Sequence, residues 1–246
     1  MTATLVVQSH RSPLPFGWLR ACIDSVTGWS RVNRYQHRFI GDEIFDLVAP
    51  DLLQKIGPQT VVATDLARLR ALQQGLTEGF ECVVWCDADF LIFKPQDFVI
   101  PAADFAFGRE VWVQQDDQGK LRAYPKLHNA CLMFRRGNAC LDFYLDTAER
   151  LLRLNQAGIP PQFIGPKLIT AMHNIARFPV MENAGMLSPL VMRDLIDGQG
   201  EALQLFREKS PVTLAGANLS SSLTAAVGFS EAEMKTLIRQ LLKGGI

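Results

Sequence analysis

The chain has 246 residues, of which 48% are hydrophobic, and this length suffices for one large domain with a substantial core. Lysine plus arginine and aspartate plus glutamate are balanced at 25 each, so no sequence-wide basic field favours nucleic acid as a partner. No apolar run approaches the roughly 20 residues that span a bilayer, and the first residues lack the segments of a signal peptide. The five cysteines show no paired Cys-X2-Cys spacing, which favours reduced, packed thiols over zinc. We therefore expect a cytoplasmic protein without a transmembrane segment, and peripheral membrane association stays open.

Apolar runs typical of strands alternate with helical patterns along the whole chain. Strands are predicted at Thr4–Gln8, Tyr35–Ile40, Glu81–Cys86, Asp104–Gly108, Ala130–Phe134 and Arg177–Val180. Helices are predicted at Trp18–Val26, Thr60–Thr77, Asn138–Leu154 (with Asn138 available as N-cap), Pro166–Asn174 and Ser230–Leu242 (with Ser230 and Glu233 in capping-box spacing). The polar segments Ser9–Gly17 and Gln114–Lys120 are expected as loops. This alternation predicts a three-layer α/β domain with a mostly parallel sheet.

Two carboxylates, Asp87 and Asp89, follow the predicted strand Glu81–Cys86 inside an otherwise apolar run. On an extended chain their side chains point the same way, about 7 Å apart. Carboxylates among apolar residues lose hydration unless a cation compensates them, and Mg²⁺ and Mn²⁺ prefer carboxylate oxygens. The pattern indicates a metal–diphosphate site, although aspartate pairs also occur in ordinary turns.

The predicted helix Thr60–Thr77 carries Asp65 inside its apolar stripe and Arg68 at the edge of that stripe. Residues three apart on a helix are close enough to share a site. A carboxylate that accepts from sugar hydroxyls, beside a guanidinium that donates to hydroxyl or phosphate oxygens, suits a sugar-nucleotide pocket. The alternative is that Thr64 or Asp65 caps the start of this helix.

The order Asp65-Leu66-Ala67-Arg68, then Asp87-Ala88-Asp89, resembles the SDxxR…DxD signature of retaining glycosyltransferases of the GT-A fold. This group includes the Och1-like α-mannosyltransferases and capsular-polysaccharide transferases, and more distantly the glucosylating clostridial toxins and galactosyltransferases of lipooligosaccharide synthesis. His128–Phe134 is similar to the family's N-[AS]-apolar strand, and Gly165–Thr170 to its GP-x-x-[LF]-T helix start. The resemblance implies a single three-layer α/β/α domain over residues 1–246. In it, about the first 95 residues hold the nucleotide sugar and metal, and residues 96–246 form the acceptor side.

The resemblance also implies a role for each matching residue. Asp89 binds the divalent cation directly, and Asp87 contacts the cation or its water and the donor ribose. Asp65 and Arg68 hold the donor sugar, and Asn129 lines the same pocket. The cofactor implied is Mn²⁺ or Mg²⁺.

Further contacts are implied by the helix start and by the C-terminal part of the chain. Gly165 and Pro166 bring the backbone close to the sugar or the acceptor. The family usually adds a C-terminal His or Asn as a metal ligand, but no histidine follows His173 here. Asn218 is the best substitute, in a polar loop that also offers the hydroxyl of Ser220; an ordinary Asn/Ser-rich turn is the alternative.

The residues after the first predicted strand, Gln8, Ser9 and His10, are candidates for contacts to the nucleotide base, and a plain loop is the alternative. The implied reaction moves a hexose from a nucleoside-diphosphate sugar, with a UDP-sugar favoured, to a glycan or other hydroxyl acceptor. The cation offsets the charge that grows on the leaving diphosphate. With retention of configuration, the diphosphate accepts the acceptor's proton, so no general base is obligatory.

Three other functions compete with this interpretation. A haloacid-dehalogenase-like phosphatase also uses Asp-X-Asp, but normally at the end of its first strand. A nucleotidyltransferase has a glycine-rich loop after its first strand, which Ser9–Leu14 does not provide. A sugar-nucleotide-binding protein, or a hydrolase without efficient transfer, stays open because the C-terminal histidine is missing.

Overall fold

A central six-stranded sheet organises the computed structural model, which describes residues 3–156 and 158–246. The strand order is β2-β1-β3-β6-β5-β7, and among these described strands only β6 runs antiparallel to its neighbours. The bounds are β1 Thr4–Ser9, β2 Gln36–Ile40, β3 Cys82–Cys86, β5 Phe105–Gln115, β6 Leu121–Arg135 and β7 Val180–Met181. The expectation of a mostly parallel sheet is therefore confirmed.

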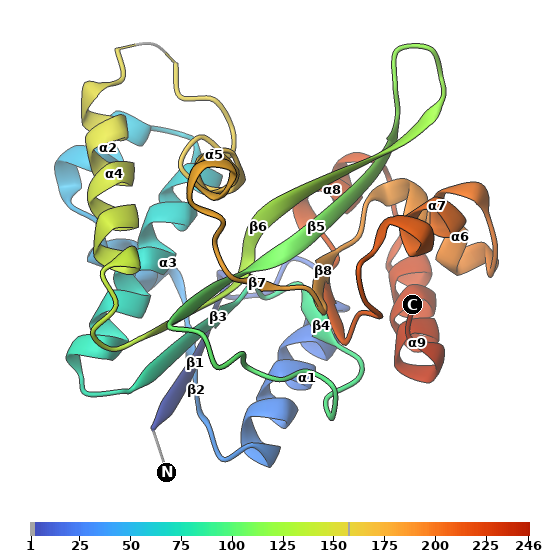
Figure 1. Cartoon of the computed structure of the whole chain (residues 1–246), viewed down its shortest axis with the longest axis horizontal. Coiled ribbons are helices and arrows are strands. Elements are labelled where there is room, and N and C mark those ends of the chain that lie inside the picture. Colours follow the sequence, from blue (N-terminus) through green and yellow to red (C-terminus); the bar gives the residue numbers. More distant parts are fainter. Residues whose placement is uncertain (1–2, 157) are drawn as a thin grey trace.

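Helices cover both faces of this sheet and extend beyond its far end (Figure 1). Their bounds are α1 Leu19–Val32, α2 Pro50–Ile56, α3 Thr60–Thr77, α4 Cys140–Leu154, α5 Pro166–Ala176, α6 Pro189–Asp197, α7 Glu201–Lys209, α8 Ser221–Ala226 and α9 Glu231–Gly244, with a 3₁₀ helix η1 at Asp42–Leu47. Ser230 and Glu233 form the expected capping box at the start of α9. Among the described helices, none is long and apolar enough to cross a membrane.

Successive residues of the inner strands supply two opposite cores. Leu5 and Val83 pack among helices α2 to α5, whereas Val6 and Val84 pack against α1. Strands buried on both faces are apolar over successive positions, as Leu5–Val7 of β1 and the whole of β3 are. A third cluster lies where Val111 and Val113 of β5 meet α6, α7 and α9. The sheet thus presents its carboxyl edge between two groups of helices.

A second, three-stranded sheet lies beside the first, with the order β4-β9-β8. Its strands are β4 Phe90–Ile92, β8 Ala184–Met186 and β9 Gly216–Asn218. In the antiparallel pair, Phe90 lies opposite Asn218, and this register carries the C-terminal part of the chain to the turn that holds Asp89. Segments of three residues are too short to show a strand pattern, so the sequence did not predict this sheet.

Several predicted bounds differ from the structure. The predicted loop Gln114–Lys120 is confirmed for residues 116–120, which join β5 to β6, but β5 continues through Gln115. Helix α1 begins at Leu19 and continues to Val32, past the predicted end at Val26. Helix α4 begins at Cys140, after an Ala139 N-cap, and Asn138 accepts a hydrogen bond from the Cys140 N–H instead of capping the helix directly. The helix at Thr60–Thr77 has the predicted bounds.

Candidate active site

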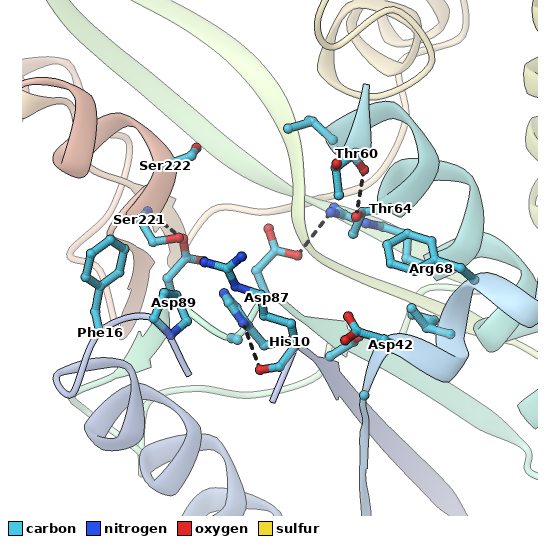
Figure 2. Close-up of a pocket in the computed structure, with 18 of the residues that line it drawn as sticks. His10, Phe16, Asp42, Thr60, Thr64, Arg68, Asp87, Asp89, Ser221 and Ser222 are labelled. Carbon is cyan, nitrogen blue, oxygen red and sulfur yellow. Dashed lines mark hydrogen bonds and ion pairs between the residues drawn. The ribbon is translucent and has the colours of Figure 1, made fainter. Parts of the chain in front are cut away.

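A cavity of about 550 Å³ opens at the carboxyl edge of β1 and β3. In open α/β sheets this edge is where ligands bind, because loops and helix starts converge there. Its walls come from the loop after β1, the start of η1, one face of α3, the turn after β3 and the start of α8. Figure 2 shows Asp87 in the middle of this cavity, with Asp89 on one side and Arg68 on the other.

The two aspartates reach the cavity from a tight turn and not from an extended strand. Strand β3 ends at Cys86, and the Phe90 N–H donates to the Asp87 carbonyl at 3.0 Å. The expected arrangement on an extended chain is therefore wrong. Both side chains nonetheless line the same cavity, because the turn folds Asp89 back toward it.

The Asp87 carboxylate is held by two side chains. Its Oδ1 atom lies 3.1 Å from Nη2 of Arg68 and accepts a hydrogen bond from Nε1 of Trp85 at 2.6 Å. Burial raises the pKa of Asp87 to about 7, against the lowering effect of Arg68, and the charge of Asp89 raises it further. A positive charge added beside these two carboxylates would favour their ionised forms.

Asp89 joins the turn after β3 to the C-terminal part of the chain. Its Oδ1 atom accepts from Nδ2 of Asn218 at 2.6 Å, and its Oδ2 atom accepts from the Ser221 N–H at 2.7 Å. Asn218 is a buried residue of β9, so the expected polar loop is wrong at this position. Its Oδ1 atom accepts from the N–H of Ser220 at 2.7 Å. Ser220 has a φ of 48°, a left-handed conformation that is uncommon for a residue with a side chain.

Asp65 lies in the second turn of α3, so the alternative of a helix cap is wrong. Its side chain is 3% exposed and accepts from Nδ2 of Asn129 at 2.8 Å, while Nη2 of Arg68 lies 3.5 Å away. Burial raises the pKa of Asp65. Its Oδ2 atom has no hydrogen-bond partner among the described residues. A side chain at Gly165 would place its Cβ 2.5 Å from this oxygen, so the close approach requires glycine.

Arg68 connects these carboxylates. Its guanidinium contacts Asp65 and Asp87, donates to the Asn129 carbonyl and lies 5.3 Å above the ring of Trp85. Asp89 lies beside Asp87 on the same cavity, which Arg11 also lines. Carboxylates that lose hydration in a partly buried site favour a nearby cation.

The structure divides the expected site residues into two groups. The cavity is lined by Ser9, His10, Arg68, Asp87 and Asp89. The others do not line it: Gln8, Asp65, Asn129, Gly165 and Asn218 are buried, and Pro166 and Ser220 are half-buried.

Several lining residues were not expected, among them Arg11, Phe16, Asp42, Thr60, Thr64, Ser221 and Ser222. Ser221 contacts Asp89 through its backbone N–H, which any residue type provides. Its sequence therefore contains no signal for this contact. Asp42 follows β2, and only the sheet order brings it toward Asp87.

The carboxylate oxygens of this cavity, from Asp87 and Asp89, fit a hard divalent cation. Asn218 does not line the cavity, and it presents its NH₂ group to Asp89 while its amide oxygen accepts from Ser220. Among the described residues, no three His, Cys, Asp or Glu side chains form a group that could hold a metal. Two carboxylates leave positions on a cation that phosphate oxygens can take.

Comparison with known proteins concerns the fold. No protein-family model matches the chain, and no curated protein matches it in sequence. One similar solved structure is a glycosyltransferase involved in the glycosylation of the major capsid of PBCV-1, with a TM-score of 0.52 and 11% identity over 96% of this chain and 98% of that chain. Another is the galactosyltransferase LgtC in complex with donor and acceptor sugar analogs, with a TM-score of 0.46 and 13% identity over 96% and 95%. The chain therefore has the mixed α/β fold of GT-A-type glycosyltransferases.

Proposed function

We propose that this chain is a metal-dependent glycosyltransferase that moves a hexose from a nucleoside-diphosphate sugar to a glycan or other hydroxyl acceptor. One observation carries the proposal: Asp87 and Asp89 place two carboxylates on a cavity of about 550 Å³, beside a buried guanidinium that contacts Asp65 and Asp87. That volume suits a small organic ligand. A divalent cation supplies positive charge next to Asp87 and Asp89, and a diphosphate supplies oxygen ligands that complete the shell of the cation.

In this proposal Asp87 and Asp89 hold Mn²⁺ or Mg²⁺, and Asn218 adds its amide oxygen. When bound, the cation acts as a Lewis acid on the leaving diphosphate. Ser9 and His10 line the part of the cavity beside β1, where the nucleoside lies. A UDP-sugar is the favoured donor.

The donor sugar lies toward α3. Arg68 donates to its hydroxyl or phosphate oxygens, and Asp65 accepts from a sugar hydroxyl with the Oδ2 atom that has no partner among the described residues. Because Asp65 and Asn129 lie behind the cavity wall, this contact requires the backbone at Gly165 and Pro166 to move away from Asp65. Residues 1–95 then supply most donor contacts, and residues 96–246 form the acceptor side.

The proposed transfer reaction needs no side chain of the protein as a general base. The bond between the anomeric carbon and the diphosphate oxygen breaks, and its electron pair stays on the diphosphate. The acceptor hydroxyl oxygen bonds to the anomeric carbon on the same face, and its proton passes to the diphosphate. The anomeric configuration is thereby retained.

A thermal-shift panel tests the proposal with UDP, GDP, CMP and dTDP, each with and without Mn²⁺. A ligand at 100 times its dissociation constant adds about 2.7 kcal/mol of stability. We expect one nucleoside diphosphate to stabilise the protein only with Mn²⁺, and the matching sugar nucleotide to be consumed in an acceptor-dependent way. Absence of any stabilisation contradicts the proposal.

Two other outcomes identify the competing functions. Stabilisation without turnover, or donor hydrolysis that no acceptor accelerates, indicates a binding protein or a hydrolase. Phosphate release from a phosphomonoester, with no nucleotide effect, indicates a haloacid-dehalogenase-like phosphatase. The GT-A fold and the position of the aspartates after β3 favour the transferase.

A further inference from the structure

Gln8, at the carboxyl end of β1, is buried and turned away from the cavity. It does not line the cavity in which the nucleotide base was expected to bind. Instead, its Nε2 atom donates to the backbone carbonyl of Asp87 at 3.1 Å, and its Oε1 atom lies 3.0 Å from Nε2 of His37. One side chain thus connects β2, β1 and the turn after β3.

The chemistry of Gln8, His37 and the Asp87 carbonyl determines which atom donates and which accepts in each hydrogen bond. A backbone carbonyl only accepts, so Gln8 must present its NH₂ group to Asp87 and its oxygen to His37. His37 must then carry its proton on Nε2, and this N–H donates a hydrogen bond to Oε1 of Gln8. Only one orientation of the Gln8 amide satisfies both of its contacts in this hydrogen-bond relay, and the other ring nitrogen of His37, Nδ1, lies 3.4 Å from Oγ1 of Thr27.

The relay acts on the backbone of the residue that we place on the cation. The Asp87 N–H donates to the Ala130 carbonyl at 2.8 Å, and the Phe90 N–H donates to the Asp87 carbonyl at 3.0 Å. Gln8 supplies a further contact, from the side of β1. These three hydrogen bonds hold the Asp87–Phe90 turn from both neighbouring strands and from within the turn. They thereby fix the direction in which its two carboxylates point.

We propose that Gln8 is a positioning residue, which holds the Asp87–Phe90 turn in the geometry that binds the divalent cation. His37 supports Gln8 through the same hydrogen-bond relay. The inference rests on the proposed function. It assigns to Gln8 a role through Asp87 and no contact with the nucleotide. Metal-site geometry is sensitive to such outer contacts, since their loss commonly weakens metal binding by 10–100-fold.

Gln8→Met tests the inference, because methionine keeps the length and the packing and removes both hydrogen bonds. Mn²⁺ is titrated by electron paramagnetic resonance with saturating UDP, or with whichever nucleoside diphosphate stabilises the protein most. We expect Mn²⁺ affinity to fall roughly tenfold, and the KM for Mn²⁺ to rise more than kcat falls. Affinity for the nucleotide without metal should not change.

Arg135→Met is the matched control. Arg135 also binds two backbone carbonyls, those of Ala103 and Pro101, but it lies opposite Cys82 at the other end of β3. It should lose stability and keep wild-type Mn²⁺ affinity. Equal losses of Mn²⁺ affinity in the two variants would mean that Gln8 acts only on stability, and the inference would be wrong.

His37→Phe provides a second test that does not depend on the folding of Gln8→Met. It leaves Gln8 in place but removes the donor to its oxygen, so a smaller loss, about threefold, is expected. If His37 acts through Gln8, the double variant should bind Mn²⁺ no more weakly than Gln8→Met alone. Wild-type affinity in both single variants overturns this inference and leaves the proposed function intact. Absence of nucleotide-dependent Mn²⁺ binding in the wild-type protein overturns both.

Discussion

The guanidinium of Arg68 lies 3.1 Å from the carboxylate of Asp87, across the boundary between helix α3 and the turn after β3. The Arg68 side chain is 6% exposed. Removal of its partner Asp87 would therefore leave a buried charge that water cannot compensate, which costs free energy. The contact links the two sequence motifs that lie about twenty residues apart. It joins the Asp65/Arg68 pair of α3 and the Asp87/Asp89 pair into one group of interacting charges.

Asp89→Asn should abolish most Mn²⁺-dependent nucleotide binding while the protein stays folded. The substitution removes a negative charge from the cation site, and it places an NH₂ group against the Asn218 amide or the Ser221 N–H. We expect a stability loss of about 1–2 kcal/mol, measured by urea unfolding. Asp116→Asn is the control, since Asp116 also accepts backbone N–H groups but at the tip of the hairpin. Wild-type activity in Asp89→Asn, or after EDTA treatment, contradicts a metal site.

Asp65→Ala should impair turnover far more than stability. Arg68 keeps Asp87 as a partner, so the main structural loss is the acceptor for Asn129, which costs about 1–2 kcal/mol. Turnover should fall roughly 100-fold, because the sugar-side groups lose their fixed geometry. Melting temperature and kcat measured on the same preparation decide the question. A purely structural role predicts the stability loss with near-normal turnover.

Asn218 should rotate its amide when a cation binds. Its Oδ1 atom now accepts from Ser220, while its Nδ2 atom donates to Asp89. A crystal structure with Mn²⁺ and a nucleoside diphosphate should place Oδ1 about 2.1–2.2 Å from the metal, the distance typical of small hard cations. The turn at Ser220 should then change conformation. An amide that keeps its hydrogen bonds to Ser220 and Asp89 in that complex contradicts the assignment.

His128 should lower the stability of the fold as the pH drops from about 6.5 to 4, opposite in sign to Asp87, whose raised pKa favours the fold as the pH decreases. His128 is buried and neutral in the fold, with Nδ1 accepting from the Ala130 N–H and Nε2 against the Ala184 carbonyl. Burial lowers its pKa to about 4, below the ordinary value of 6.5. The unfolded chain therefore binds more protons in this range, and stability is lost as the pH decreases, by about 3 kcal/mol at pH 4. Urea unfolding of wild type and His128→Gln at pH 7 and pH 4 measures the difference. Identical pH dependence of the two proteins contradicts the assignment.

The fold class could be predicted from the sequence because its signals are local. The continuous apolar runs of β1 and β3 indicate strands buried on both faces, and the helical period of Thr60–Thr77 places Asp65 on the buried side. The long hairpin strands were harder to predict. Their outer halves are half exposed, and the polar residues there hide the alternation that marks a strand.

For the site, the sequence by itself determined which charged residues stand at buried or half-buried positions, because a charged residue inside an apolar run can be recognised without the fold. These residues are Asp65, Arg68, Asp87 and Asp89. Only the tertiary structure decided which groups they meet. Asn218 is 129 residues from Asp89 in the chain, and the pairing of β4 with β9 joins them. Gln8 reaches the Asp87 carbonyl because parallel β1 and β3 are neighbours in the sheet. Such contacts depend on strand order and register, which are set by packing of the whole core, so no local pattern contains them.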